Sequence, residues 1–172
     1  VDADGKTGDG AGIHVEIPKD FFIEKIQVTG HDYDNSEICV GMIFLPRNDY
    51  SAQESCKTIV ESELTKNNFS IYGWRQVPVN PKVLGEKALQ TMPEIIQVLF
   101  KSNDPNLLDK NLERKIYETR KRIENKAFDA SLNNFYICSI SSKSIIYKGL
   151  YLAEAISDFY LDLKDTRFIS RY

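Results

Sequence analysis

The glycine-rich opening segment, Asp2–Gly12, combines residue types that can hold phosphate or calcium. Gly5-Lys6-Thr7 matches the end of a phosphate-binding P-loop, in which backbone N–H groups and a lysine hold the phosphates. A P-loop must lead into a helix, whereas Gly8, Gly10 and Gly12 would each destabilise a helix by about 1 kcal/mol relative to alanine. A nucleotide site therefore stays an alternative, which calorimetry with ATP or GTP would test.

The same segment contains two aspartates at the spacing that begins a calcium loop, Asp2 and Asp4. An EF-hand loop also needs an oxygen ligand at its fifth position, glycine at its sixth and glutamate at its twelfth. The chain has Lys6, Thr7 and Ile13 at these places. The spacing therefore argues against a calcium site.

Three cysteines and two histidines are the other residues that could bind a metal or attack a substrate. Cys39, Cys56 and Cys138 are far apart and form no CxxC pair, and His14 and His31 lack metal-ligand spacing. We therefore predict no metal site. Because each cysteine lies in an apolar strand-like run or on the apolar stripe of a helix, we expect buried structural thiols in a reducing compartment. No Ser/His/Asp or Cys/His catalytic set can be assembled from the sequence.

Composition places the chain among ordinary globular domains. Its 172 residues are 42% hydrophobic and 27% charged, so we expect one folded domain. The net charge of −3 gives no reason to expect a nucleic acid or membrane partner. The cations between Lys110 and Lys126 alternate with glutamates, which favours a solvated helix face. With no signal peptide and no 18-residue apolar run, we expect a cytoplasmic protein, or an organellar one if a leader preceded Val1.

Local patterns predict the elements that must position any site. Apolar runs closed by turn residues predict strands at 13–18, 38–45, 69–74 (continuing through Val77 and Val79), 93–100, 134–141 and 143–148, the last two forming a hairpin, with a further strand beginning in 166–172. Helical spacing predicts helices from Ser51 to Asn67, with Glu54 completing a capping box, at 83–89, from 106 or 107 to 126, and at 151–163. Leu108, Leu112, Ile116 and Ile123 are expected on the buried face of the third helix. Strands that are apolar on both faces favour a layered fold with largely antiparallel sheets.

Six stretches in order match one known family. They are 2–13, 40–46, 73–78, 112–115, 139–141 with 146–149, and 159–163. In these stretches the chain resembles the N-terminal class II glutamine amidotransferase domain of glutamate synthases, over essentially its whole length. The resemblance implies an α+β fold, a four-layer αββα N-terminal-nucleophile hydrolase sandwich with mainly antiparallel sheets. It implies that residues 1–172 are the central part of this domain, incomplete at both ends.

The resemblance also implies a function for the parent protein. An N-terminal cysteine, activated by its own α-amino group, hydrolyses glutamine to glutamate and ammonia. The ammonia is channelled to a second site, where 2-oxoglutarate is aminated and reduced with FMN, an iron–sulfur cluster and electrons from NAD(P)H or ferredoxin. These cofactors belong to the parent enzyme and none is expected on this segment. The expected partners are glutamine, the rest of the large subunit, and a small subunit or ferredoxin.

Residue by residue, the resemblance assigns no catalytic residue within this chain. The nucleophilic cysteine is expected upstream of Val1, and none of Cys39, Cys56 and Cys138 occupies its place. A motif with an essential arginine and the Asn-Gly pair of the oxyanion hole are expected downstream of Tyr172. The glycines of Asp2–Gly12 are expected to allow tight backbone packing beside the glutamine pocket, but no substrate-binding residue is assigned. We therefore expect this segment alone to be inactive. The alternative is a non-catalytic scaffold or regulatory domain of the same fold.

Overall fold

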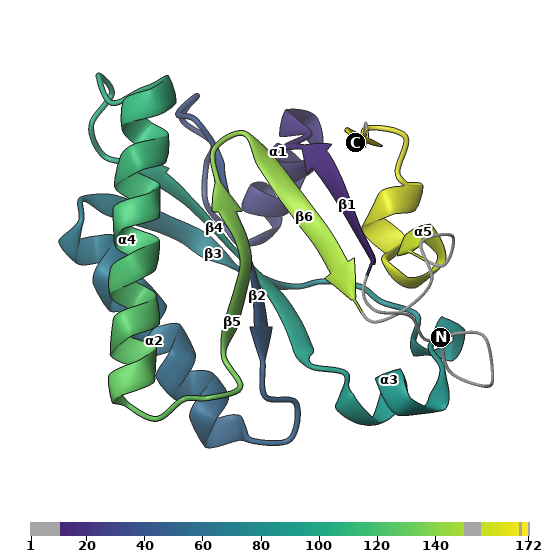
Figure 1. The fold of residues 1–172 in the computed structure, drawn as a ribbon. Coiled ribbons are helices and arrows are strands. Elements are labelled where there is room, and N and C mark those ends of the chain that lie inside the picture. The colour runs from purple at the N-terminus through teal and green to yellow at the C-terminus, as the bar shows by residue number, and fades with distance from the viewer. Residues whose placement is uncertain (1–10, 150–155, 169, 172) are drawn as a thin grey trace.

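The computed structural model describes residues 11–149, 156–168, 170 and 171. Most of the glycine-rich segment, 1–10, and the first part of the predicted last helix, 150–155, lie outside the described residues. Two antiparallel sheets pack face to face, and a pair of helices covers the outer face of the larger sheet (Figure 1).

The larger sheet has four strands in the order β3-β4-β2-β5, all antiparallel. Its strands are β2 (Cys39–Leu45), β3 (Phe69–Gln76), β4 (Glu94–Ser102) and β5 (Tyr136–Ser141). The two central strands are buried on both faces for nearly their whole length, as their continuous apolar character predicts. Gly41 in β2 is required by packing, because a Cβ there would lie 2.7 Å from a methyl group of Val98 in β4.

The smaller sheet has the order β6-β1-β7 and brings the two ends of the described chain together. Its strands are β1 (Ala11–Glu16), β6 (Ser144–Gly149) and β7 (Ser170–Arg171). Both strands of the predicted hairpin are present and joined by the predicted turn, but the hairpin itself is wrong: β5 pairs with β2 in the larger sheet, whereas β6 pairs with β1 in the smaller one. The turn between them is fixed by Glu113, whose Oε1 accepts hydrogen bonds from the Ser142 N–H at 2.7 Å and the Ser142 hydroxyl at 2.6 Å.

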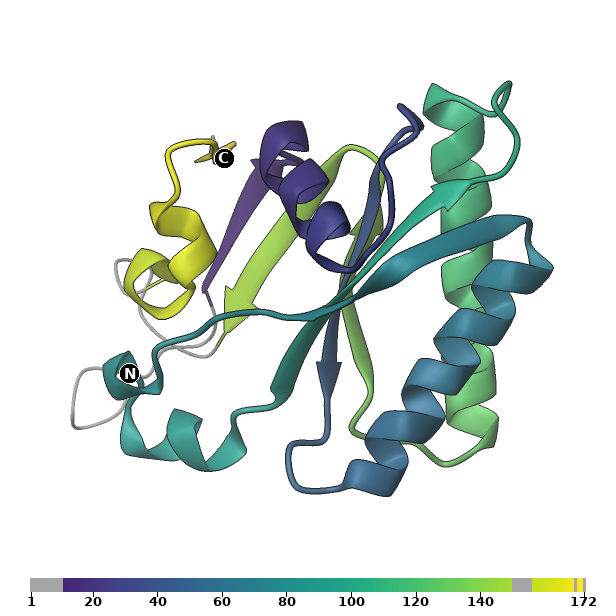
Figure 2. The ribbon, with the colours of Figure 1, turned by 180° about the vertical axis from the view of Figure 1, so that it is seen from behind.

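Helices α2 (Tyr50–Lys66) and α4 (Asp109–Asp129) lie side by side on the outer face of the four-stranded sheet (Figures 1 and 2). Both are predicted by their apolar periodicity. The predicted start of the first at Ser51 is wrong: the carbonyl of Asp49 accepts the first helical hydrogen bond, and its carboxylate accepts the Ala52 N–H at 3.0 Å. Leu108 is also not on the buried face, because the helix begins after it and 48% of its surface is exposed.

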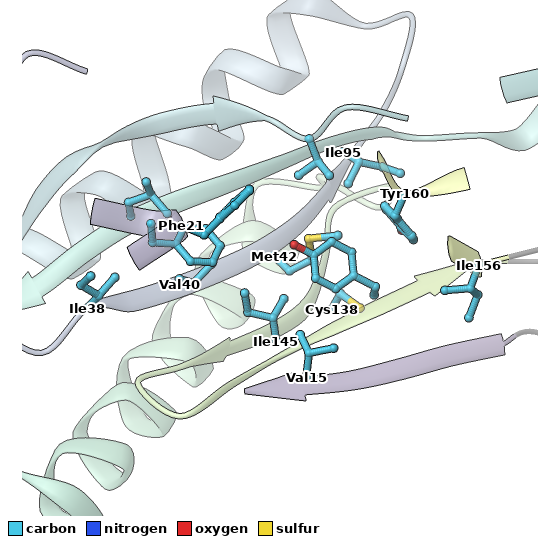
Figure 3. Close-up of a cluster of buried hydrophobic side chains, with 14 of the residues drawn as sticks. Val15, Phe21, Ile38, Val40, Met42, Ile95, Cys138, Ile145, Ile156 and Tyr160 are labelled. Carbon is cyan, nitrogen blue, oxygen red and sulfur yellow. The ribbon is translucent and has the colours of Figure 1, made fainter. Parts of the chain in front are cut away.

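One hydrophobic core lies between the four-stranded sheet and helices α2 and α4. A second core fills the space between the two sheets (Figure 3). Val40 and Met42 of β2 face Val15 and Ile145 of the smaller sheet, and all four side chains are fully buried. Helix α1 (Lys19–Val28), which is not predicted, contributes Phe21, Phe22 and Ile26 to this core.

The predicted helix at 151–163 is replaced, in its described part, by two short pieces, α5 (Ile156–Phe159) and a 3₁₀ turn (Leu161–Lys164). Tyr160 between them is extended because it forms a bridge with Val79, and the Leu161 N–H donates to the Pro78 carbonyl instead of continuing a helix. Before β4 the chain forms a 3₁₀ turn (Pro81–Val83) and α3 (Glu86–Thr91), close to the predicted helix at 83–89.

The predicted fold class is confirmed: the structure is a mixed α+β fold built on antiparallel sheets. Gly12, His14 and Glu16, on the outer face of the smaller sheet, are exposed. Within the ranges that the structure describes, no helix is both long enough and apolar enough to cross a membrane.

Candidate functional site

The three cysteines are buried, as predicted, and their surroundings do not favour nucleophilic chemistry. Burial raises the pKa of Cys39 far above its usual value and raises the pKa of Cys56 and of Cys138 to about 11. Since the thiolate is the attacking form of cysteine, a thiol that stays protonated at neutral pH is a poor nucleophile. The Cys138 thiol also donates to the Ile146 carbonyl at 3.3 Å. A nucleophilic role is therefore unsuitable for all three.

The two histidines lie apart, each beside a hydroxyl. His14 Nε2 is 2.6 Å from the Ser144 hydroxyl, in a contact between β1 and β6 on the outer face of the smaller sheet. His31 Nδ1 is 3.2 Å from the Thr29 hydroxyl. Across residues 11–149, 156–168, 170 and 171, no group of three or more His, Cys, Asp or Glu side chains could hold a metal ion.

The described end of the glycine-rich segment enters the smaller sheet directly. Ala11 pairs with Gly149 and Gly12 with Lys148. A Cβ at Gly12 would lie 3.7–3.9 Å from its nearest neighbours in β6, which is ordinary contact distance. Tight packing therefore does not explain the glycine at this position. Gly5, Gly8 and Gly10 lie outside the described residues.

A buried ion pair connects Arg75 with Asp162. Arg75 of β3 donates two hydrogen bonds to the Asp162 carboxylate, one from each terminal nitrogen, at 2.8 and 3.0 Å. The Arg75 side chain is 11% exposed and the Asp162 side chain 3%. The pair joins the four-stranded sheet to the 3₁₀ turn that follows α5.

Neutral side chains complete this network. The Tyr147 hydroxyl donates to Asp162 at 2.9 Å, and Arg75 also donates to the Gln97 carbonyl oxygen at 2.7 Å. The Gln97 amide nitrogen lies 3.2 Å from the Tyr147 oxygen and 3.4 Å from the sulfur of Met42. Burial, and then the negative charge of Asp162, raise the pKa of Tyr147 well above its usual value, so that it stays a neutral donor. Such a saturated, enclosed network is suited to holding elements in place rather than to proton transfer.

A cleft of about 780 Å³ opens at the end of the sandwich where β1 begins. We call it the end cleft. Its walls come from the ends of β2, β4, β5 and β6, from α3 and α5, and from the segments that connect the strands with the helices. The lining residues are Phe44–Asp49, Leu84, Gln90–Pro93, Ile95, Asn133–Tyr136, Lys148 and Phe159.

Sequence reasoning predicted neither the ion pair nor the end cleft. Arg75 and Asp162 are 87 residues apart, and no local motif links them. The one feature of the sequence that points to these two residues is that each lies in a stretch matching the family, 73–78 for Arg75 and 159–163 for Asp162. The structure brings these stretches together in pairs: 73–78 contacts 159–163 through Arg75 and Asp162, and 112–115 contacts 139–141 through Glu113 and Ser141.

Comparison with known proteins first identifies the class of protein. Two antiparallel sheets packed face to face agree with the fold implied by the resemblance, and the family model of the class-II glutamine amidotransferases matches residues 1–172. The chain belongs to this family.

The individual relatives narrow the comparison to one kind of enzyme within this family. The chain is 49% identical to the glutamate synthase (NADPH) large chain of Azospirillum brasilense over 172 residues, covering 100% of this chain and 11% of that protein. It is 38% identical to ferredoxin-dependent glutamate synthase 1 of Arabidopsis thaliana and 37% identical to the ferredoxin-dependent enzyme of Spinacia oleracea, covering 99% of this chain and 10% of each protein. The resemblance to the glutamate synthases is confirmed. The chain spans about a tenth of the length of these relatives.

Proposed function

We propose that this chain is part of the glutaminase domain of a glutamate synthase, which hydrolyses L-glutamine to glutamate and ammonia. The observation that carries the proposal is the match of the whole chain to the amidotransferase family, together with 49% identity to one glutamate synthase over the same residues. The relatives carry this region as a tenth of a much longer protein.

In the proposed reaction the nucleophile comes from outside residues 1–172. The thiolate of an N-terminal cysteine attacks the amide carbon of glutamine, ammonia leaves, and water hydrolyses the resulting thioester. We place this cysteine upstream of Val1, and the arginine motif and the Asn-Gly oxyanion pair downstream of Tyr172. The protonated, buried thiols of Cys39, Cys56 and Cys138 support this division. The described residues then supply the scaffold that holds the catalytic groups.

The ammonia is proposed to serve a second site in the same enzyme. There 2-oxoglutarate is aminated and reduced, with FMN and an iron–sulfur cluster bound by other parts of the protein. The names of the relatives include both NADPH and ferredoxin. We therefore propose NAD(P)H or ferredoxin as the electron donor, and a small subunit or ferredoxin as the partner protein. We propose that the protein is cytoplasmic or lies in an organelle. The name of the Arabidopsis thaliana relative gives a chloroplastic or mitochondrial location for that protein.

The test is a glutaminase assay on the complete domain. The domain is produced from the upstream cysteine through the downstream Asn-Gly pair, processing of its N-terminus is checked by mass spectrometry, and release of glutamate from glutamine is measured. We expect hydrolysis that is lost when the first cysteine is replaced by alanine and unchanged in Cys56→Ala. A correctly processed, folded domain without hydrolysis would refute the proposal and favour the scaffold alternative.

A further inference from the structure

The end cleft is lined by partly accessible apolar side chains and has exposed tyrosines in or next to its lining. Phe44 and Met92 in its lining pack against the core between the sheets but remain partly accessible. Tyr136 on its rim is 45% exposed, and Tyr50, next to the lining residue Asp49, is 76% exposed. Large apolar side chains grouped around an open groove are typical of surfaces that contact another protein segment.

Two cations stand on the same rim without an anionic partner among the described residues. Arg47 donates only a long hydrogen bond, 3.5 Å, to the Leu89 carbonyl. The Lys148 ammonium lies 5.5 Å from the centre of the Tyr136 ring and 3.5 Å from its hydroxyl. The Asp49 carboxylate, also in the lining, is already engaged as the N-cap of α2. The rim therefore favours a ligand that carries negative charge.

The chemistry of the end cleft does not suit a free amino acid. An α-amino acid needs an acceptor for its ammonium group, and among the described residues of the lining the one carboxylate is that of Asp49. Sites for small polar ligands hold them with a few convergent polar groups. Here the amide and hydroxyl side chains of the lining are all exposed, and its buried or half-buried members are apolar, among them Phe44, Ile95 and Phe159. An extended apolar segment with acidic neighbours fits better.

We propose that the end cleft is a docking surface for another segment of the same polypeptide, one outside residues 1–172 that places an apolar side chain in the cleft and an acidic residue beside Arg47 and Lys148. This inference rests on the proposed function, because the glutamate synthase relatives are about ten times longer than this chain. Aromatic anchors with a charged rim give such contacts their affinity and their specificity.

The test uses the full-length enzyme with a photo-crosslinking residue in the cleft. Tyr136→p-benzoylphenylalanine is irradiated, and cross-linked peptides are mapped by mass spectrometry. Asn134, exposed on the same rim, is the second position in case the first variant folds poorly. Tyr117, 58% exposed on α4 and outside the cleft, is the matched control. We expect both cleft positions, and not Tyr117, to cross-link to a peptide outside residues 1–172. Reversing Arg47 and Lys148 together to glutamate should reduce the cross-linked fraction about tenfold.

Other outcomes would overturn the proposal. They are cross-links confined to residues 1–172, cross-links to a second copy of the protein in an isotope-mixed sample, or equal labelling from Tyr117. Loss of the Tyr136 cross-link in saturating glutamine would instead assign the cleft to the substrate. Cross-linking requires no activity, so an active enzyme without the cross-link refutes the docking surface alone. Cross-linking from Tyr136 together with no glutaminase activity in the correctly processed, unsubstituted enzyme refutes the proposed function alone.

Discussion

The buried ion pair of Arg75 and Asp162 predicts that the losses of folding stability in single and double variants are not additive. Asp162→Asn leaves the Arg75 guanidinium without its counter-ion in a site where the arginine side chain is only 11% exposed. Breaking a buried ion pair on one side costs about 3–5 kcal/mol of folding stability. Replacing both residues, as Arg75→Met with Asp162→Leu, removes both charges. That change leaves one hydrogen-bonding group unpaired on Gln97 and another on Tyr147, at a cost of about 1–3 kcal/mol for each. Because the double variant buries no charge without its partner, its loss of stability should be smaller than the sum of the losses from Arg75→Met and Asp162→Leu measured singly.

The assay is equilibrium unfolding in urea, followed by the fluorescence of Trp74. This is the only tryptophan of the chain. It precedes Arg75 in β3, and its ring nitrogen donates to Glu61 at 2.7 Å, so its signal should report loss of this part of the sheet. Free energies of unfolding are compared only where the denaturant slopes agree.

A surface pair supplies the matched control. Asp165 accepts hydrogen bonds from Arg167 at 2.7 and 2.9 Å, a geometry close to that of the buried pair, but both side chains are much more exposed. Asp165→Asn should destabilise the protein far less than Asp162→Asn, because water solvates the remaining charge. Equal losses from these two variants would refute the reasoning. So would a double variant whose loss equals the sum of the losses from Arg75→Met and Asp162→Leu measured singly.

Three further outcomes are expected. Asp49→Ala should cost about 1 kcal/mol in urea unfolding and Ser51→Ala clearly less, because Asp49 is the cap of α2; the reverse order would contradict the structure. The hydrogen bond from Lys101 holds the pKa of Asp34 well below its usual range. The stabilisation by the ionised Asp34 carboxylate is therefore complete above the pKa of about 3.9 that it has in the unfolded chain. This stabilisation is lost as the pH falls towards the lower pKa of Asp34 in the folded protein. The gap in urea midpoint between the protein and Asp34→Asn should therefore narrow from pH 6 to pH 2, and a constant gap would argue against this. Cys56 and Cys138 should react slowly with a disulfide reagent at pH 8 in the native protein and rapidly in urea, since burial raises the pKa of both; a fast native thiol would contradict their burial.

Sequence patterns predict the elements whose own residues determine them. Helix α4 is found from the spacing of Leu112, Ile116 and Ile123, and β2 from an apolar run that is buried on both faces. Helix α1 escapes prediction because it has only 10 residues and its N-cap, Pro18, provides no side-chain cap, although Phe22 and Ile26 have helical spacing. Its stability comes from placing them between the two sheets, a contact that no local pattern contains.

The same limit applies to the last predicted helix and to the network. The residues 156–163 have helical spacing, but Tyr160 is extended because it pairs with Val79, far away in the sequence. Arg75 and Asp162 meet only once β3 and the C-terminal turn are assembled. The family resemblance was the one source of information on long-range partners, and it identified the stretches without saying which of them touch.

The position of β1 in the smaller sheet has a consequence for synthesis of the protein. Its partners are β6 and β7, and His14 contacts Ser144, 130 residues later in the chain. At roughly 5–20 residues per second on the ribosome, β1 waits about 7–26 s for a strand to pair with. During that interval Val15, which is fully buried in the finished fold, has no partner from its own sheet. Nascent chains of this domain should therefore depend on chaperones until translation has passed β6.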